Sequence, residues 1–200
     1  MERYMTVIRR ADLADVEGLG ALARRTWREM SVLDFAMPYS EKDMAIFEAQ
    51  KSSDAVIQAR ILDQDQSVWV ADDGGRLIGY ADAGRCDLPH VEVAPNDMEL
   101  NRLYVSRDRQ GHGYGKRLID AALAWMATRA PGPQWIGVWS GNLKAQRLYR
   151  TYGFEKVGEY DFPVGAWIDR DFIMRRPGQI GARQVGHPSK TCFSGEGTPP

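Results

Sequence analysis

Three glycines alternate with other residues in the segment R-Q-G-H-G-Y-G-K-R, residues 109–117, which leads into an apolar, helix-like stretch. Glycines at such a junction let backbone N–H groups turn toward one point, and the N-terminus of the following helix adds partial positive charge. Lys116 and Arg117 add full charges. These features predict a site for a phosphate or pyrophosphate, with a tight strand–helix turn that binds nothing as the alternative.

Two common phosphate-binding motifs do not fit this segment. A Walker loop requires G-x-x-x-x-G-K-[ST], but Gln110 stands at its first glycine and Arg117 at its Ser/Thr position. A dinucleotide fingerprint requires G-x-G-x-x-G, which would place Lys116 at the third glycine. That fingerprint also follows a first parallel strand, whereas this segment lies in the second half of the chain, after an antiparallel-looking meander.

A third pattern fits at two places. The stretch L-Y-V-S-R-D-R-Q-G-H-G-Y-G-K-R resembles the coenzyme A loop of the Gcn5-related N-acetyltransferases (GNAT), Q/R-x-x-G-x-G/A, through Gln110, Gly113 and Gly115. The segment S-G-N-L-K-A-Q-R-L-Y-R-T-Y-G-F, residues 140–154, is similar to the family's N-x-x-A-x-x-x-Y-x-x-x-G-F. Within the family, E-L-N-R-L-Y-V and W-I-G-V-W resemble the PaiA-type polyamine acetyltransferases.

The resemblance implies transfer of an acetyl group from acetyl-CoA to an amine, without a metal. It implies that the pyrophosphate lies on the N–H groups of residues 111–116, and that the pantetheine arm pairs like an extra strand with residues 103–105. A backbone N–H near Val105 would face the developing oxyanion. The implied cofactor-binding residues are Leu103, Tyr104, Val105, Gln110, Gly111, His112, Gly113, Tyr114, Gly115, Lys116, Asn142, Ala145 and Tyr149.

The resemblance also assigns the proton transfers. Tyr149 would donate a proton to the sulfur of CoA, although its spacing alone would equally suit a core stripe. Asn142 would contact the pantetheine or a water, or would simply cap a helix. Gly137 stands where many family members carry a glutamate base, so Glu99, acting through a water, is the alternative base. The alternatives for Glu99 are a solvated strand acid or a partner of Arg102. The reaction could also need no base, if a small fraction of neutral amine suffices.

The acceptor site is expected between the first helices, the loop of residues 85–97 and the last hairpin. Its aromatic candidates are Trp27, Phe35, Tyr39, Trp139, Phe162 and Trp167. Its acidic candidates, which could attract a cationic amine, are Asp34, Glu92, Asp97 and Glu99. A small-molecule amine is the expected acceptor. The alternatives are a protein or peptide acceptor, and a non-catalytic acyl-CoA-binding regulator.

Local patterns predict the elements that position these residues. Helices are expected after the N-cap candidate Asp12, from Ser40, over 54–62, after the glycine loop, and over 142–152. Strands are expected over residues 4–9, 67–71, 76–83, 98–105, 134–139, 154–160 and 167–174. Over 98–105 the apolar Leu100, Leu103 and Val105 contrast with Glu99, Arg102 and Tyr104. This order predicts an α/β (α+β) domain with a single mixed, mostly antiparallel sheet flanked by helices, as the GNAT fold has.

Composition sets the frame for this domain. The chain has 200 residues, 44% of them hydrophobic, and a net charge of −1. We expect a GNAT domain over residues 1–176 and a Gly/Pro/Ser-rich tail over 177–200, where 11 of 24 residues are of those types. The charge balance disfavours nucleic-acid partners, and no apolar run reaches the roughly 20 residues of a membrane span.

The N-terminal residues, the cysteines and the histidines bear on cellular location and on metal binding. Residues 1–10 lack the apolar core of a signal peptide, and Cys86 and Cys192 are too far apart for a ligand pair. We therefore expect free thiols in a reducing cytoplasm. His90, His112 and His187 have no paired ligands, so no metal site is expected. The resemblance allows a homodimer, for which no residue gives evidence.

Overall fold

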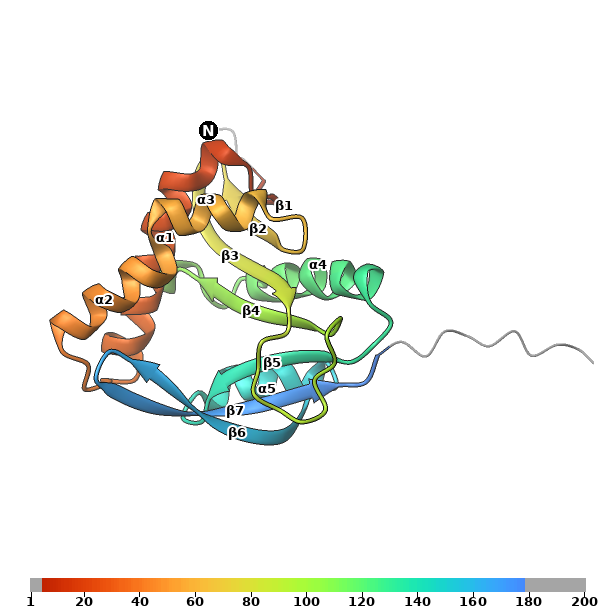
Figure 1. The fold of residues 1–200 in the computed structure, drawn as a ribbon. Coiled ribbons are helices and arrows are strands. Elements are labelled where there is room, and N and C mark those ends of the chain that lie inside the picture. The colour runs from red at the N-terminus through yellow and green to blue at the C-terminus, as the bar shows by residue number, and fades with distance from the viewer. Residues whose placement is uncertain (1–4, 179–200) are drawn as a thin grey trace, which may run out of the picture.

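The central sheet of the computed structural model, which describes residues 5–178, has seven strands in the order β1-β2-β3-β4-β5-β7-β6 (Figure 1). The strands are β1 (Val7–Arg10), β2 (Ser67–Asp73), β3 (Arg76–Arg85), β4 (Met98–Val105), β5 (Gln134–Trp139), β6 (Glu155–Val164) and β7 (Trp167–Arg176). Every neighbouring pair is antiparallel except β4–β5, which is parallel. The predicted mixed, mostly antiparallel sheet is confirmed.

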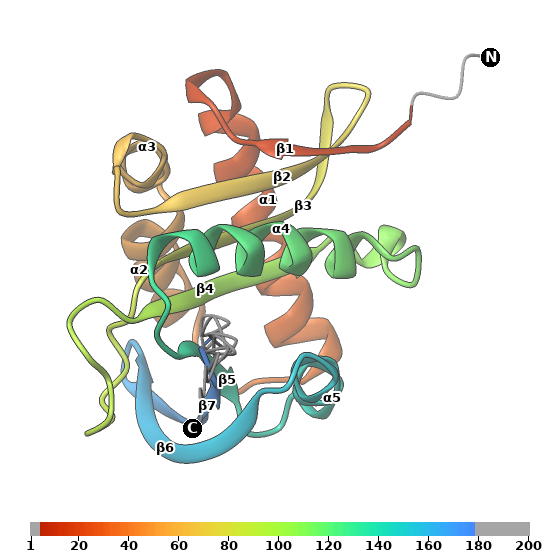
Figure 2. The ribbon, with the colours of Figure 1, turned by 90° about the vertical axis from the view of Figure 1, so that its right-hand side faces the viewer.

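Helices cover both faces of this sheet. The helices are α1 (Val16–Arg28), α2 (Glu41–Ser52), α3 (Asp54–Leu62), α4 (Tyr114–Arg129) and α5 (Leu143–Thr151), with short turns η1 (Leu13–Asp15), η2 (Glu29–Asp34) and η3 (Arg107–Arg109). Helices α1 to α3 lie on the opposite face of the sheet from α4 (Figure 2). No helix among residues 5–178 combines the length and apolar character needed to cross a bilayer.

The core forms where apolar stripes of these helices meet the sheet. Leu118, Ile119, Ala122 and Met126 of α4 are fully buried against residues such as Ile78. Their spacing is the i, i+1, i+4, i+8 pattern of one helix face. Burying one such aliphatic side chain contributes about 1.5–3 kcal/mol, so α4 anchors the strand that precedes it. A second cluster, with Leu19 and Val70, forms on the α1 face.

The predicted helix starts agree with the caps that form. Asp12 caps η1 through the N–H of Ala14, and Asp15 returns a bond to the Asp12 N–H, so the helix pair opens on a capping box. Ser40 Oγ accepts the Asp43 N–H at 3.1 Å. Helix α3 has the predicted bounds.

The last hairpin is longer than predicted. Strand β6 continues past Tyr160 to Val164, and β7 continues past Met174 to Arg176. Pro163 argues against a strand, but β6 is an edge strand, where a residue without an N–H is tolerated. The predicted strand at residue 4, most of the predicted tail, Cys192 and His187 lie outside the described residues.

Strand β4 carries a bulge that places its side chains. Ala83 pairs with Leu100 and Asp82 with Arg102, so Asn101 is an extra residue. The bulge explains how Leu100 and Leu103, three positions apart, both face the α4 core. Glu99, Arg102 and Tyr104 consequently share the other face, toward α1 to α3, as the sequence pattern indicated.

Strands β4 and β5 pair only at their beginnings. Met98 pairs with Gln134 and Glu99 with Trp135, and no further pair follows. The sheet therefore opens beyond Glu99, which is the splay expected from the resemblance. Residues 103–105 of β4 lie on the edge that the splay leaves without a β5 partner.

Candidate active site

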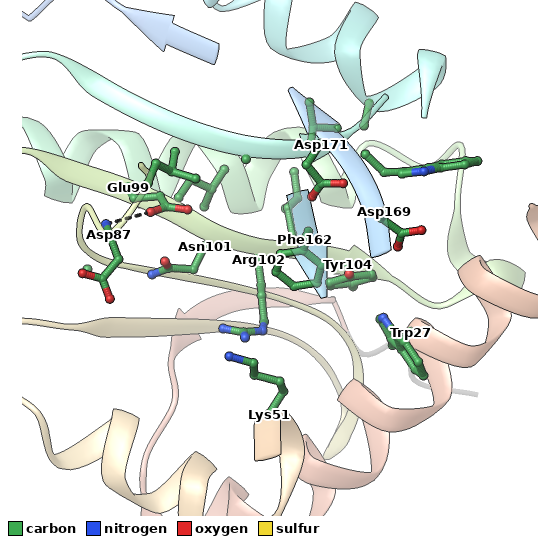
Figure 3. A pocket seen from close by; sticks show the side chains of 18 of the residues that line it. Trp27, Lys51, Asp87, Glu99, Asn101, Arg102, Tyr104, Phe162, Asp169 and Asp171 are labelled. Atoms are coloured by element: carbon green, nitrogen blue, oxygen red, sulfur yellow. Dashed lines mark hydrogen bonds between the residues drawn. The ribbon is translucent and has the colours of Figure 1, made fainter. Parts of the chain in front are cut away.

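A cavity of about 720 Å³ lies at the splay between β4 and β5. Side chains from α1, α2, α3, β4, β5, α5 and the β6–β7 hairpin line it, so parts far apart in the sequence share one space (Figure 3). Among the predicted site residues, the cavity is lined by Glu99, Leu103, Tyr104, Asn142, Ala145 and Tyr149. A volume of this size suits a small ligand together with the reactive end of another.

The glycine loop leads into a helix start that has no capping side chain. Gly111 and Gly113 both have φ +81°, in the left-handed region that glycine adopts without strain. Gly113 is the N-cap, and no side chain caps the helix. The N–H groups of the first turn therefore lack intrahelical partners. The first turn contains no acidic residue, so an anion meets no like charge there.

Gln110 ties this loop to two other elements. Its Nε2 donates to the Val105 carbonyl at 3.2 Å, and its Oε1 accepts from Lys144 Nζ at 2.6 Å. His112 Nδ1 lies 2.9 Å from the Gln110 carbonyl oxygen, which holds the imidazole against the loop itself. The loop, the end of β4 and the start of α5 are thus connected through one glutamine.

Tyr149 occupies the part of the cavity that α5 supplies. It is 8% exposed, and its ring packs edge-on to Phe154 at a centroid distance of 6.2 Å. Burial raises the pKa of the phenol, so the hydroxyl stays protonated at neutral pH. Asn142 caps α5 by accepting the Ala145 N–H at 3.0 Å, which is the simpler of its two predicted roles. The amide nitrogen of Asn142 is not used in that bond.

Glu99 is a buried carboxyl on the cavity wall. It is 8% exposed and accepts the Asp87 N–H at 3.2 Å. Burial, with a contribution from Asp82, raises the pKa of Glu99 to about 7. Glu99 is therefore not a solvated strand acid. It is not the ion-pair partner of Arg102 either, because Arg102 donates to Asp82 at 3.0 Å.

A second buried carboxyl, Asp171, was missed from the sequence. Burial and the neighbouring Asp169 raise the pKa of Asp171 to about 7, while a hydrogen bond with Tyr160 opposes the shift. Asp169 accepts from the Tyr39 hydroxyl and from Trp167 Nε1. The available signal was the pair of acids two residues apart in W-I-D-R-D-F-I-M, which places both on one face of a strand.

Gly137 lies where another side chain has taken the space. A Cβ built at Gly137 would lie 2.8 Å from the Tyr160 hydroxyl and 3.2 Å from Leu88 Cδ2. Tyr160 stands opposite Asp171 across the β6–β7 pair. The space that a side chain at Gly137 would need is therefore occupied by a tyrosine of the last hairpin, which pairs across the strands with Asp171.

The acceptor candidates divide between the cavity and other places. Trp27, Tyr39, Trp139 and Phe162 line the cavity, whereas Phe35 packs on Trp139 at 4.7 Å and Trp167 is 43% exposed.

Three of the four acidic candidates lie elsewhere. Asp97 is buried and accepts from Trp135 Nε1 at 2.8 Å, Asp34 faces Arg107 at 3.5 Å, and Glu92 faces Arg175 at 3.7 Å. Only Glu99 of the four lines the cavity, and each of the other three contacts a partner residue that lies on another element and outside the cavity lining. Within residues 5–178 no group of three His, Cys, Asp or Glu side chains is placed to hold a metal ion.

Comparisons with known proteins identify the family. Residues 24–154 match the Acetyltransferase (GNAT) family. An uncharacterised N-acetyltransferase of Mycobacterium tuberculosis is 30% identical over 82% of this chain and 98% of that protein. A spermine/spermidine N(1)-acetyltransferase of Bacillus subtilis is 28% identical over 44% of this chain and 59% of its own length.

Solved structures agree in fold. The PaiA N-acetyltransferase of Thermoplasma acidophilum, crystallised with coenzyme A, superimposes with a TM-score of 0.67 at 23% identity, covering 86% of this chain and 99% of that one. The family match, the relatives and the glycine loop beside a splayed sheet agree with one another. The chain belongs to the GNAT family and is an acetyl-CoA-dependent N-acetyltransferase.

Proposed function

We propose that this enzyme acetylates a primary amine of a small molecule, by direct attack on acetyl-CoA in a ternary complex. The observation that carries the proposal is one cavity that joins the splayed edge of β4, the phenol of Tyr149 and the buried carboxyls of Glu99 and Asp171. A thioester placed at the splay would have a proton donor on one side and proton acceptors on the other. Direct attack needs these groups around one carbon atom.

Closure of the cavity favours a small acceptor over a peptide. The β6–β7 hairpin is tied to α2, because the Ala166 N–H donates to Asp43 Oδ1 at 3.0 Å. Val164 packs against Trp27 and Met44, and the Tyr39 hydroxyl bonds Asp169 of β7. A protein terminus would need an open groove at this place. The contacts instead wall the cavity on the side of α1 and α2.

The cofactor half follows from the loop geometry. The free N–H groups at the start of α4 would bind the pyrophosphate, with Lys116 as a further charge. The unpaired edge of residues 103–105 would bind the pantetheine amides as an added strand. Both contacts use backbone groups, so they would hold acetyl-CoA without dependence on any one side chain.

The chemical step would use three side chains. The protonated amine would give a proton to Glu99 through a water, or to Asp171. The freed nitrogen would form the new C–N bond at the thioester carbonyl, and the C–S bond would break as the intermediate collapses. Tyr149 would protonate the leaving thiolate, and the second proton that the nitrogen loses on becoming an amide would restore the phenol. A carboxyl whose pKa is about 7 is well matched to the proton acceptor, since it is substantially ionised at neutral pH.

Two assays test the proposal. The first is thermal denaturation of the protein with acetyl-CoA, CoA or NAD. The second is thiol release from acetyl-CoA across a panel of amines. Stabilisation by acetyl-CoA and CoA but not NAD, with thiol release that depends on one class of small amines, would support it. Thiol release only with peptides would contradict it. Stabilisation without release would favour the second candidate, an acyl-CoA-binding protein without turnover, which the missing glutamate at Gly137 motivates.

The expected reducing cytoplasm also remains a proposal. Burial raises the pKa of the Cys86 thiol to about 12, so this cysteine is a poor nucleophile. It is also the one cysteine among residues 5–178, where it is a free thiol.

A further inference from the structure

One wall of the cavity carries an excess of positive charge. Lys51 of α2, Arg60 of α3 and Arg102 of β4 all line it. A single buried carboxylate, Asp82, contacts the two arginines, at 3.0 Å from Arg102 and 3.8 Å from Arg60. Both contacts use Oδ2 of Asp82, which is 1% exposed, and its Oδ1 has no hydrogen-bond partner among the described residues. Asp63, Asp65 and Asp87 also line the cavity but are exposed to solvent, and Asp65 pairs with Arg85 at 3.0 Å. Three cations thus share one buried carboxylate.

Asp82 pairs with the two arginines and not with Lys51, the third cation of this wall. Lys51 is half-buried at the end of α2 and forms no ion pair within the described part of the chain. Burial lowers the pKa of Lys51, and repulsion by Arg102 and Arg60 lowers it further. Asp87 is the one acid acting in the opposite direction, and it is exposed to solvent. An anion beside Lys51 would relieve this repulsion and replace the solvation that burial removes.

Two buried acids, Glu99 and Asp171, lie at the other end of the cavity. Figure 3 shows Lys51 and Arg102 pointing toward each other on one side of the cavity, with Glu99 and Asp171 on the other. Tyr104 and Phe162 lie between the two groups in this view. An ammonium group would therefore be favoured at one end and disfavoured at the other. A polyamine, which carries cations along its whole length, would place one of them against Lys51 and Arg102.

We propose that the acceptor carries an anionic group, a carboxylate or a phosphate, in addition to its amine. The anion binds Lys51 and Arg102, and the amine is thereby directed to Glu99 and Asp171. This inference rests on the proposed small-molecule transferase activity and narrows its substrate class. A carboxylate and a phosphate are alike in charge and hydrogen-bond acceptors, so the structure assigns the shared chemistry and the experiment separates the two.

The test compares acceptors that differ only in the anion. Steady-state thiol release is measured with γ-aminobutyrate against butylamine, with phosphoethanolamine against ethanolamine, and with spermidine. Binding of the same compounds to the CoA-loaded protein is measured by calorimetry, which does not require turnover. We expect at least one anionic amine to exceed its neutral counterpart by 10-fold or more in kcat/KM and in affinity, and to exceed spermidine. The better of the two pairs identifies the anion.

Variants of Lys51 show whether the preference arises at this wall. Lys51→Met keeps most of the side chain's length and removes its charge, so the 10-fold preference should fall to about 2-fold, through KM rather than kcat. Lys51→Arg should restore it. Lys42→Met is the matched control, because Lys42 is an exposed lysine of the same helix and lies outside the cavity lining. That variant should keep the full preference.

The outcomes separate this inference from the proposed function. Equal turnover of anionic and neutral amines, or a preference for spermidine, would overturn the inference and leave the small-molecule transferase intact. Binding of an anionic amine that Lys51→Met abolishes, without thiol release from any amine, would uphold the anion site and overturn the proposed turnover. A preference that Lys51→Met leaves unchanged would overturn the assignment to Lys51. Neither binding nor turnover of any amine would overturn both.

Discussion

The proposed active site has two halves that are built in different ways. The proposed cofactor half consists of backbone groups, at the uncapped start of α4 and on the unpaired edge of β4, and comes from the 14 consecutive residues 103–116, of which only Leu103 and Tyr104 line the cavity. The acceptor half consists of side chains from α1, α2, α3, β4 and the β6–β7 hairpin.

Charge divides the halves in the same way. The first turn of α4 holds no acid, whereas the acceptor half holds Glu99 and Asp171 with raised pKa values, opposite Lys51 and Arg102. Backbone recognition suits a cosubstrate that all family members share, while side-chain recognition can change the acceptor without altering the loop. Substitutions in the two halves should therefore separate acetyl-CoA binding from acceptor binding and chemistry.

The largest effect is expected at the glycine loop. Gly113→Asp places a carboxylate at the N-cap of α4, where the pyrophosphate would bind, on a residue with φ +81°. We expect the thermal shift with acetyl-CoA to vanish and kcat/KM to fall by more than about 10³-fold, since like charges repel at this site. Gly75→Asp is the control, because Gly75 has φ +91° in the β2–β3 turn with nothing near its Cβ position. Equal losses in both variants would attribute the effect to backbone strain.

A smaller but selective loss is expected from Tyr149→Phe. Removing the hydroxyl would lower kcat by about 10²-fold, within the range typical of a general acid, and leave the acetyl-CoA dissociation constant unchanged. Tyr152→Phe, at the C-cap of α5, is the control, because the Tyr152 hydroxyl donates to Asp120 at 2.7 Å and Tyr152 does not line the cavity. An unchanged kcat in Tyr149→Phe would remove Tyr149 from the mechanism.

The proton acceptor can be identified by comparing Glu99→Gln with Asp171→Asn. Both carboxyls have pKa values near 7, so kcat/KM should rise with pH through about 7 as the essential carboxyl ionises. The variant that lacks the essential group should lose this rise and about 10-fold or more of the activity at pH 8. If each single variant keeps the rise, neither carboxyl alone is the base.

The raised pKa of Glu99 also predicts how Glu99→Gln changes the free energy of unfolding with pH. A carboxyl whose pKa is higher in the folded than in the unfolded state destabilises the fold once the pH exceeds both values. Glu99→Gln should therefore raise the free energy of unfolding above pH 7 by on the order of 1–3 kcal/mol, and by little at pH 4. Urea denaturation at both pH values measures it, and no difference between them would contradict the raised pKa.

The smallest effect is expected from Gly137→Ala. The new Cβ would lie 2.8 Å from the Tyr160 hydroxyl, so the β6–β7 hairpin must shift. We expect a loss of about 1–3 kcal/mol in the free energy of unfolding and a higher KM for the amine, with acetyl-CoA affinity unchanged. Gly18→Ala in α1 is the control, because its nearest neighbour would be Leu77 Cδ1 at 3.7 Å. A change in acetyl-CoA affinity would contradict the separation of the two halves.

The sequence patterns predicted most elements because each is a local property. The Asp12 and Ser40 caps, the apolar stripe of α4 and the glycines at 111 and 113 act within one or two turns of the chain. The hairpin strands were predicted too short, because continued pairing beside Pro163 depends on β6 being an edge strand. Edge position is a property of the sheet and not of the segment.

The acceptor half shows what local sequence patterns could not predict. Asp34, Glu92 and Asp97 were plausible acids, but each is held by a partner outside the cavity, while Asp171 and Lys51 were not recognised. The importance of Asp171 and Lys51 depends on burial and on neighbours that lie far away in the sequence. Burial in the folded chain removes water from the carboxyls of Glu99 and Asp171 and raises their pKa values to about 7. No local sequence pattern reports that burial.

The sequence by itself determined the family and the order of strands and helices, because short continuous motifs and local periodicity encode both. Only the tertiary structure decided which ionisable side chains meet at the amine. Tyr160 fills the space beside Gly137, Arg102 turns to Asp82, and Lys51 is left facing the cavity. These outcomes depend on long-range packing and desolvation, which arise only when β4, α2 and the last hairpin close around one space.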